Sequence, residues 1–262
     1  MPFINVSDYK VNYQAPQGIP ESDSKPIMLL VHGAGGSSRH WLPMLSQLNA
    51  DIFPVAVDLP GHGETSGTVP NSVTAVAEFL DSFLTAIKIK QPIYYVGHSL
   101  GGLIGLQFAL NYPQRVKQLV VMATSAKIKL HPDFLASALS GEWDLATLRQ
   151  SFAPEVPETS KNLVLNEFKH TRLDSAADDF MGVSEIDLSS AIASLSIPTL
   201  IITGADDVII SPRKGMLLLK QIPDARLVNI PGAGHYLQVE EPDKVAKEIE
   251  EFLLSALVGS SK

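Results

Sequence analysis

Continuous apolar runs, each ended by glycine, proline or a polar residue, recur along the chain. Such runs are typical of strands buried on both faces of a parallel sheet, because a half-exposed strand would alternate apolar and polar positions. Five of them lie at 27–33 (IMLLVHG), 53–63 (FPVAVDLPGHG), 92–99 (PIYYVGHS), 117–124 (KQLVVMAT) and 198–205 (PTLIITGA), and a shorter one lies at 225–230 (ARLVNI). The first part of the chain alternates loosely instead, which predicts two short strands that meet at Ser7 and Asp8.

Segments with helical periodicity separate these strands. They lie at 38–48, 71–87, 100–111 and 243–257. Strands that alternate with helices predict βαβ units. We therefore expect an α/β fold with a doubly wound, mostly parallel sheet that is covered by helices on both faces.

One long segment departs from this alternation. Residues 127–194 contain no strand-like run, only helix-prone pieces with scattered aromatic residues. A segment of this length is too long for a loop inside a compact domain. We therefore expect a helical cap insertion at 127–194, which would lie over one end of a core domain formed by residues 1–126 and 195–262.

The composition narrows the class of protein. Of the 262 residues, 45% are hydrophobic and 18% are charged, which is typical of a globular protein with a substantial core. The formal net charge of −8 argues against nucleic acids and anionic membranes as partners, because both require basic patches. Cysteine is absent, and neither a basic-apolar leader nor an apolar stretch of about 20 residues is found. We expect a soluble, cytoplasmic protein.

A sharp turn at the end of one predicted strand contains the first candidate catalytic residue. Gly97-His98-Ser99-Leu100-Gly101 matches the G-x-S-x-G elbow, in which a strained turn between a strand and a helix exposes a serine. Ligands bind beyond the carboxyl ends of strands in a doubly wound sheet, so Ser99 lies where chemistry is expected. Glycines at the two flanking positions would leave room for the close backbone, and the helix that follows would direct its positive end at the same place.

A serine hydroxyl needs a base to become a nucleophile, and that base must itself be oriented. His235 has the right setting, in a glycine-bearing loop between the last predicted strand and the closing helix. His32 and His62 lie in glycine-rich loops, where hydrogen bonds that stabilise the loop are expected, and His98 is adjacent to Ser99 and points elsewhere. The other three, which we expect on the surface or in packing, are His40, His131 and His170.

The orienting acid is expected at a strand end between the serine and the histidine in chain order. Asp206 and Asp207 both follow the buried run 198–205, and position alone does not separate them. Two backbone N–H groups are candidates for an oxyanion hole. One belongs to Leu100, the residue after the nucleophile, and the other to Ala34, which lies among glycines that permit unusual backbone angles. No cluster of His, Asp and Glu has metal-ligand spacing, and no glycine loop carries the lysine of a phosphate-binding loop, so we expect no metal and no cofactor.

From position 27 to the C-terminus, the chain resembles proteins of the α/β-hydrolase fold. The resemblance rests on HGAGG, DLPGHGETS, GHSLGG, GADDVIISP and GAGHYLQVEEP, which occur in the order of that family. Its G-x-x-D pattern favours Asp207 as the acid. The resemblance thus implies a triad of Ser99, Asp207 and His235 and an oxyanion hole from Ala34 and Leu100. It also implies that the insertion corresponds to the variable cap of the family and that Asp58 and His62 belong to a structural turn.

The leading hypothesis for function is a serine hydrolase, a carboxylesterase that cleaves small to medium, largely apolar esters through an acyl-enzyme. The same triad would also serve an enol-lactonase-like enzyme, a C–C bond hydrolase or a peracid-forming enzyme, and a ligand receptor with vestigial activity is the alternative of another class. Haloalkane and epoxide hydrolases are excluded, because they need a carboxylate where this elbow holds serine. We expect a small-molecule ester or lactone as substrate, and a monomer or a homodimer. The apolar cap residues, which would form a small core and in part line the pocket, include Phe134, Leu135, Trp143 and Phe152.

Overall fold

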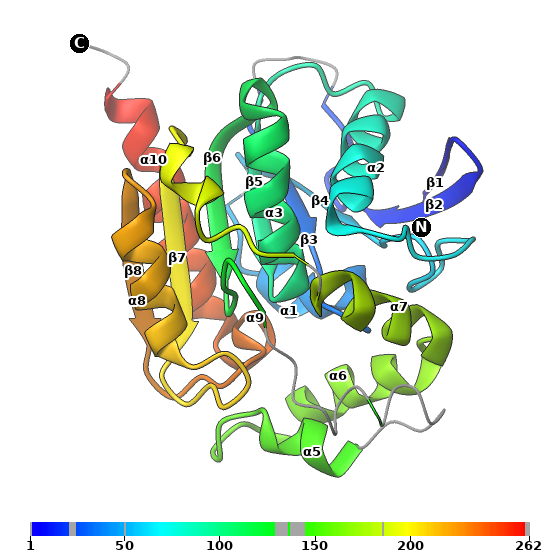
Figure 1. The fold of residues 1–262 in the computed structure, drawn as a ribbon, viewed down its shortest axis with the longest axis vertical. Coiled ribbons are helices and arrows are strands. Elements are labelled where there is room, and N and C mark those ends of the chain that lie inside the picture. Colours follow the sequence, from blue (N-terminus) through cyan, green and yellow to red (C-terminus); the bar gives the residue numbers. More distant parts are fainter. Residues whose placement is uncertain are drawn as a thin grey trace.

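A central sheet of eight strands organises the molecule (Figure 1). The computed structural model describes residues 2–20, 25–49, 51–128, 136, 145–184 and 186–259. The strands are β1 (Phe3–Val6), β2 (Tyr9–Gln14), β3 (Ile27–Val31), β4 (Phe53–Val57), β5 (Ile93–His98), β6 (Val116–Met122), β7 (Thr199–Gly204) and β8 (Ala225–Ile230). Their order in the sheet is β1-β2-β4-β3-β5-β6-β7-β8.

The sheet is parallel except at one edge. From β4 to β8 all neighbouring strands pair in parallel, whereas β1 with β2 and β2 with β4 pair antiparallel. The two antiparallel strands are joined at the predicted corner, where Ser7 has a φ of 50°. The predicted doubly wound, mostly parallel α/β sheet is therefore confirmed.

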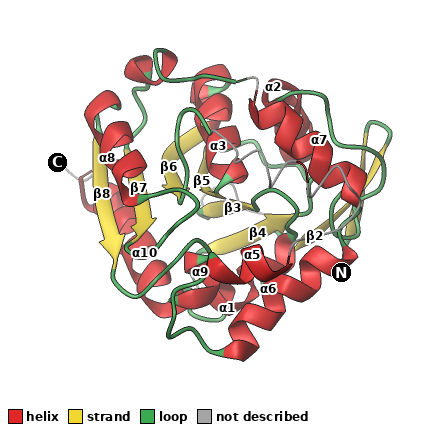
Figure 2. Cartoon of the chain, turned by 60° about the horizontal axis from the view of Figure 1, so that its bottom comes forward, coloured by secondary structure: helices red, strands yellow, loops and turns green. Residues whose placement is uncertain are grey.

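Helices cover both faces of the sheet (Figure 2). One face carries α2 (Val73–Ala86), α3 (Leu100–Asn111) and α8 (Pro212–Gln221), and the other carries α1 (Leu42–Leu45), α9 (Leu237–Glu240) and α10 (Pro242–Gly259). Each parallel strand contributes side chains to the cores on both faces of the sheet. In β3, for example, Leu29 packs into the first core and Leu30 into the second. This two-sided burial is the reason why the strand sequences are continuous apolar runs.

Two helical features differ from the sequence prediction. The helix expected at 38–48 is divided into a 3₁₀ turn, η1 (Ser38–Trp41), and the short α1. Pro43 explains the division, because it lacks the N–H that a continuous helix would need and fits only the first turn of a new one. Helix α8 was not predicted, although Ser211 followed by Pro212 is a helix-start signal.

Between β6 and β7 lie the helices α5 (Leu145–Gln150), α6 (Glu158–His170) and α7 (Leu173–Ser184), followed by the 3₁₀ turn η3 (Ala191–Ser194). The three α-helices gather beside one end of the sheet (Figure 1). The 3₁₀ turn returns to the main core, where Ile192 is fully buried. The division into a core and a separate cap at 127–194 stays a prediction. Within the described part of the chain, no helix combines the length and the apolarity that a membrane span requires.

Candidate active site

Ser99 stands at the corner between β5 and α3 in a strained conformation. Its φ of 53° and ψ of −116° lie in a region that non-glycine residues rarely adopt. Backbone hydrogen bonds hold it there, because its N–H donates to Met122 O at 2.8 Å and its C=O accepts from the Thr124 hydroxyl at 2.7 Å. The strain turns the side chain out of the core, and Ser99 is partly exposed among buried neighbours.

The two flanking glycines are required by space. A Cβ at Gly97 would lie 2.2 Å from the carbonyl oxygen of Gly101, and a Cβ at Gly101 would lie 2.2 Å from the carbonyl oxygen of Val31. Both contacts are with rigid backbone, which cannot move aside as a flexible side chain would. The predicted steric reason for these glycines is confirmed.

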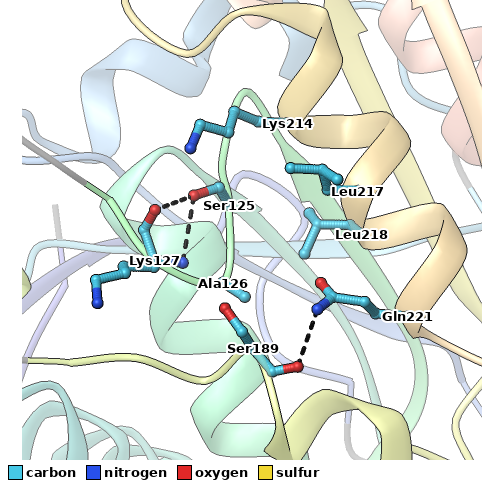
Figure 3. A pocket seen from close by; sticks show the side chains of 8 residues that line it. All are labelled: Ser125, Ala126, Lys127, Ser189, Lys214, Leu217, Leu218 and Gln221. Atoms are coloured by element: carbon cyan, nitrogen blue, oxygen red, sulfur yellow. Dashed lines mark hydrogen bonds between the residues drawn. The ribbon is translucent and has the colours of Figure 1, made fainter.

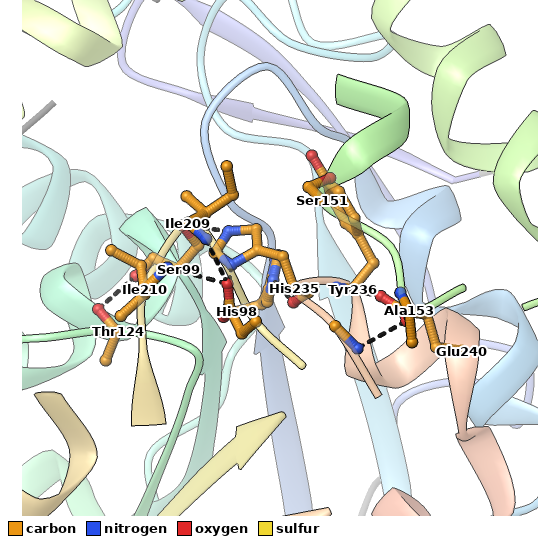
Figure 4. A network of polar contacts seen from close by, with 12 residues as sticks. His98, Ser99, Thr124, Ser151, Ala153, Ile209, Ile210, His235, Tyr236 and Glu240 are labelled. Carbon is orange, nitrogen blue, oxygen red and sulfur yellow. Dashed lines mark hydrogen bonds and ion pairs between the residues drawn. The ribbon is translucent and has the colours of Figure 1, made fainter. Parts of the chain in front are cut away.

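A chain of contacts links the serine to a histidine and a carboxylate. His235 Nε2 lies 3.1 Å from Ser99 Oγ (Figure 4). His235 Nδ1 lies 2.9 Å from Asp207 Oδ2. Because a carboxylate only accepts, Nδ1 carries the proton and Nε2 presents its lone pair to the serine hydroxyl. The three groups therefore have the arrangement in which a serine can lose its proton to an oriented base.

The structure distinguishes the two adjacent aspartates. Asp207 is buried, and its second oxygen, Oδ1, accepts the N–H groups of Ile209 at 2.8 Å and Ile210 at 2.9 Å. Asp206 is exposed, and its own N–H supports the turn by donating to Ala233 O at 2.9 Å. Only Asp207 contacts the imidazole.

A buried carboxylate that sequence reasoning missed holds the histidine loop. Glu240 accepts the N–H groups on either side of His235, from Gly234 at 2.7 Å and Tyr236 at 2.8 Å. It also accepts the N–H of Ala153 at 2.9 Å (Figure 4). Burial raises the pKa of the Glu240 carboxyl, and the three N–H donors oppose that rise. An acidic residue five positions after a loop histidine was the only local signal.

The histidine loop is also fixed from two other directions. The N–H of His235 donates to Ser151 O at 2.8 Å, and the ring of His98 lies 2.8 Å from the carbonyl oxygen of His235 through its Nε2. His98 is thus turned away from the Ser99 hydroxyl, as its place in the elbow predicts, and it supports the backbone of His235 instead. Burial lowers the pKa of His98 well below its usual value, so its ring is neutral.

The glycine-rich loop after β3 lies against the serine. A Cβ at Gly33 would lie 3.1 Å from Ser99 Cβ, and Ala34 is partly exposed between buried neighbours. Leu100 is the first residue of α3, so its N–H has no acceptor within the helix. The roles of Ala34 and Leu100 as oxyanion donors stay a prediction.

The remaining histidines have structural settings. His32 donates from Nδ1 to Gly33 O at 2.8 Å and accepts the N–H of Leu59 on Nε2 at 3.1 Å, and burial lowers its pKa to about 4. Burial lowers the pKa of His40 to about 3. His62 forms a buried ion pair with Asp179 at 2.9 Å. His170 is exposed at the end of α6, and His131 lies outside the described residues.

A small apolar core forms in the predicted cap and continues onto the histidine loop. Phe152 is buried in it, and its ring stacks on Tyr236 with 5.0 Å between the ring centroids. A part for Phe152 in the substrate pocket stays a prediction. The other three apolar candidates, Phe134, Leu135 and Trp143, lie outside the described residues.

A separate hollow of about 150 Å³ lies between the segment after β6 and helix α8 (Figure 3). Its lining includes Ser125, Lys127, Lys214 and Gln221, and none of the five residues of the predicted triad and oxyanion hole borders it. Among the described residues, no group of three His, Asp or Glu side chains is placed to hold a metal ion.

Residues 28–248 match the model of the alpha/beta hydrolase family. The pimeloyl-[acyl-carrier protein] methyl ester esterase of Edwardsiella ictaluri is 30% identical over 249 residues, covering 87% of this chain and 93% of that protein. A protein of Agrobacterium fabrum, named provisionally as the carbamate hydrolase RutD, is 26% identical over 253 residues, covering 88% and 94%. Among solved structures, the enol-lactonase from Burkholderia xenovorans superposes with a TM-score of 0.88 at 22% identity, covering 97% and 100% of the two chains.

Proposed function

The chain belongs to the alpha/beta hydrolase family, and from that premise we propose that it is a serine hydrolase that cleaves carboxylic esters through an acyl-enzyme. The observation that carries the proposal is the unbroken chain of contacts from Ser99 Oγ through His235 to Asp207, at 3.1 and 2.9 Å. The relative from Edwardsiella ictaluri that is named as a methyl ester esterase supports the choice of ester bonds.

In the acylation step, His235 Nε2 takes the proton of Ser99 as Oγ attacks the ester carbonyl carbon. The imidazolium that forms carries two N–H groups, one directed at Asp207 and the other at the departing alkoxide. Because two backbone N–H groups fix the Asp207 carboxylate, its charge is already in place when the imidazolium forms. His235 then gives its proton to the leaving alcohol.

The tetrahedral oxyanion is stabilised by the N–H groups of Ala34 and Leu100 in this proposal. Leu100 begins a helix of 12 residues, so the positive end of the helix dipole adds to the effect of its N–H. A water molecule activated by His235 then attacks the acyl-enzyme, and the same donors stabilise the second oxyanion. The products are the carboxylic acid and the free serine.

The proposed substrates are small to medium, largely apolar esters. The predicted cap at 127–194 would close over the acyl or alcohol group, and its apolar residues favour groups without charge. One relative is named as a carbamate hydrolase and one structural neighbour as an enol-lactonase. Carbamates and lactones also carry a carbonyl group that an activated serine can attack, so both belong in the substrate panel.

Replacing Ser99 with alanine tests the proposal. Ser99→Ala is expected to lower kcat for p-nitrophenyl esters by about 10⁴-fold or more, because it removes the hydroxyl that forms the acyl-enzyme in this proposal. A panel of graded acyl lengths, with lactones and carbamates beside it, identifies the substrate class. The melting temperature should change little, since the side chain is partly exposed. Ester turnover that survives in folded Ser99→Ala would remove Ser99 from the reaction.

A further inference from the structure

The turn that carries Ala34 is held by side chains of the predicted cap. The N–H of Gly35 donates to Asp179 Oδ2 at 3.0 Å, and the C=O of Gly35 accepts from the Thr171 hydroxyl at 2.7 Å. Asp179 lies on α7, and Thr171 lies between α6 and α7, more than 130 residues along the chain from the turn. Both polar groups of one buried glycine are therefore bound by the same helical segment.

These two bonds help to fix the direction in which the Ala34 N–H points. Gly35 has a φ of 63°, and the N–H of Gly36 closes the turn on Gly33 O at 3.1 Å. The His32 ring donates to the same carbonyl oxygen at 2.8 Å. Because the C=O and N–H of a peptide point in opposite directions, holding Gly33 O directs the Ala34 N–H the other way. The turn keeps this geometry only while Gly35 and Gly36 stay in place.

The Asp179 carboxylate has a charged partner of its own. It is 4% exposed, and His62 Nε2 lies 2.9 Å from its Oδ2. The other ring nitrogen of His62 faces the carbonyl oxygen of Pro60 at 3.1 Å. Both ring nitrogens of His62 therefore lie close to oxygen atoms, an arrangement that favours the protonated ring. Burial by itself lowers the pKa of His62, but Asp179, with smaller effects from the Pro60 carbonyl and Asp58, leaves the pKa raised above its usual value. The bond from Gly35 is charge-assisted because its acceptor is the carboxylate of Asp179.

We propose that Asp179 and Thr171 are positioning residues for the oxyanion donor at Ala34, so that seating of helix α7 on the core completes the site. This inference rests on the proposed function. It makes the cap segment part of the machinery that stabilises the transition state, and not only a cover for the substrate. Loss of either bond leaves Ser99, His235 and Asp207 in place but lets the turn rotate.

The test uses Thr171→Val and Asp179→Asn in the full chain, with Glu167→Ala as the matched control. Glu167 also joins the cap to the core, through Ser37 Oγ at 2.8 Å and Arg39 at 3.5 Å, but it does not contact the turn through its side chain. Thr171→Val keeps the shape of the side chain and removes the hydroxyl, which lies 2.7 Å from Gly35 O and 3.1 Å from the backbone oxygen of Glu167. Asp179→Asn weakens a buried ion pair and for that reason can fail to fold. In that case Thr171→Val alone tests the inference.

We expect Thr171→Val and Asp179→Asn each to lower kcat for a p-nitrophenyl ester by about 5- to 50-fold, with KM within about twofold of the parent. Inhibition by a phenylboronic acid, whose serine adduct carries an anionic oxygen, should weaken by a similar factor. Glu167→Ala should change neither. A kcat equal to that of Glu167→Ala, or a change confined to KM, overturns the inference. If the parent protein itself neither turns over esters nor reacts with a fluorophosphonate, the proposed function fails instead.

Discussion

The choice of orienting acid depends on a single side chain. Asp207 and Asp206 are neighbours of identical chemistry, yet only Asp207 is buried against His235 with its second oxygen held by two N–H groups. This setting fixes the tautomer of the histidine, because the carboxylate requires a proton on Nδ1. An amide at the same position can present an N–H to the ring and favour the wrong tautomer.

Asp207→Asn is therefore expected to lower kcat for ester hydrolysis by about 10³- to 10⁴-fold, whereas Asp206→Asn should stay within about twofold of the parent. Steady-state kinetics on one p-nitrophenyl ester measures both. Near-equal losses in the two variants would mean that the carboxylate of Asp207 does not orient the base.

Among individual residues, the sequence predicts those that lie in local motifs or at strand ends. It misses residues whose role depends on contacts with residues far away in the chain. Ser99 lies in a five-residue motif, and His235 and Asp207 follow strand ends, so strand prediction alone places them near one another. Asp179 acts through its bond to Gly35, which is 144 residues away in the chain. Glu240 bonds two N–H groups of its own loop, but it also joins that loop to Ala153, which is 87 residues away. No periodicity or spacing encodes such contacts. They follow from how the segment between β6 and β7 packs on the core.

At the scale of the elements, the junction between β5 and α3 determines whether the Ser99 side chain is accessible to a substrate. The strand, the corner and the helix approach so closely that Gly97 has only backbone where a side chain would be. Gly97→Ala is expected to lower the free energy of unfolding by about 3 kcal/mol, because neither the helix nor the strand can move without breaking sheet contacts.

Gly182→Ala, in helix α7, is the control, since a Cβ there meets nothing within 4 Å. It should leave the free energy of unfolding unchanged or raise it by about 0.5–1 kcal/mol, as alanine does in a helix. Chemical denaturation measures both variants. A Gly97→Ala protein as stable as the parent would show that the corner can expand.

Strands were easier to predict than helices for a physical reason. A central parallel strand is buried on both faces, so its residues are apolar without interruption, as in β3 and β7. Helix α8 combines exposed leucines with a central glycine, Gly215, whose missing Cβ would lie 2.4 Å from Thr203 Cγ2. That glycine allows close packing on β7 but obscures the helical pattern in the sequence.

On the scale of the whole molecule, the described part of the chain contains three histidines whose pKa values are lowered by burial. Burial lowers the pKa values of His32 to about 4 and of His40 to about 3, and it lowers that of His98 well below the usual value. Each group takes up a proton in the unfolded chain near pH 6.5 but not in the folded one. The unfolded state therefore binds more protons as the pH falls, and the free energy of unfolding decreases below about pH 6.5.

By pH 5 the loss is expected to be about 2 kcal/mol for each of His32 and His40, and His98 adds to it in the same direction. His62 behaves in the opposite way. Its pKa is raised, so its contribution is present below pH 6.5 and is lost as the pH rises through its folded pKa. Denaturant unfolding between pH 5 and 8 measures both trends. His40→Leu should lower the slope of the free energy of unfolding against pH by the equivalent of about one proton on the acid side. A free energy of unfolding that does not change from pH 7 to 5 would contradict this account.

The central claim is that His235 activates Ser99 as a nucleophile, and peptide mass spectrometry after exposure to a fluorophosphonate tests it most directly. In the parent protein we expect one adduct, on the peptide that contains Ser99, formed together with loss of ester turnover. In His235→Ala the rate of adduct formation should fall by about 10³-fold or more. An adduct on another residue, or labelling of Ser99 at the parental rate without His235, would contradict the claim.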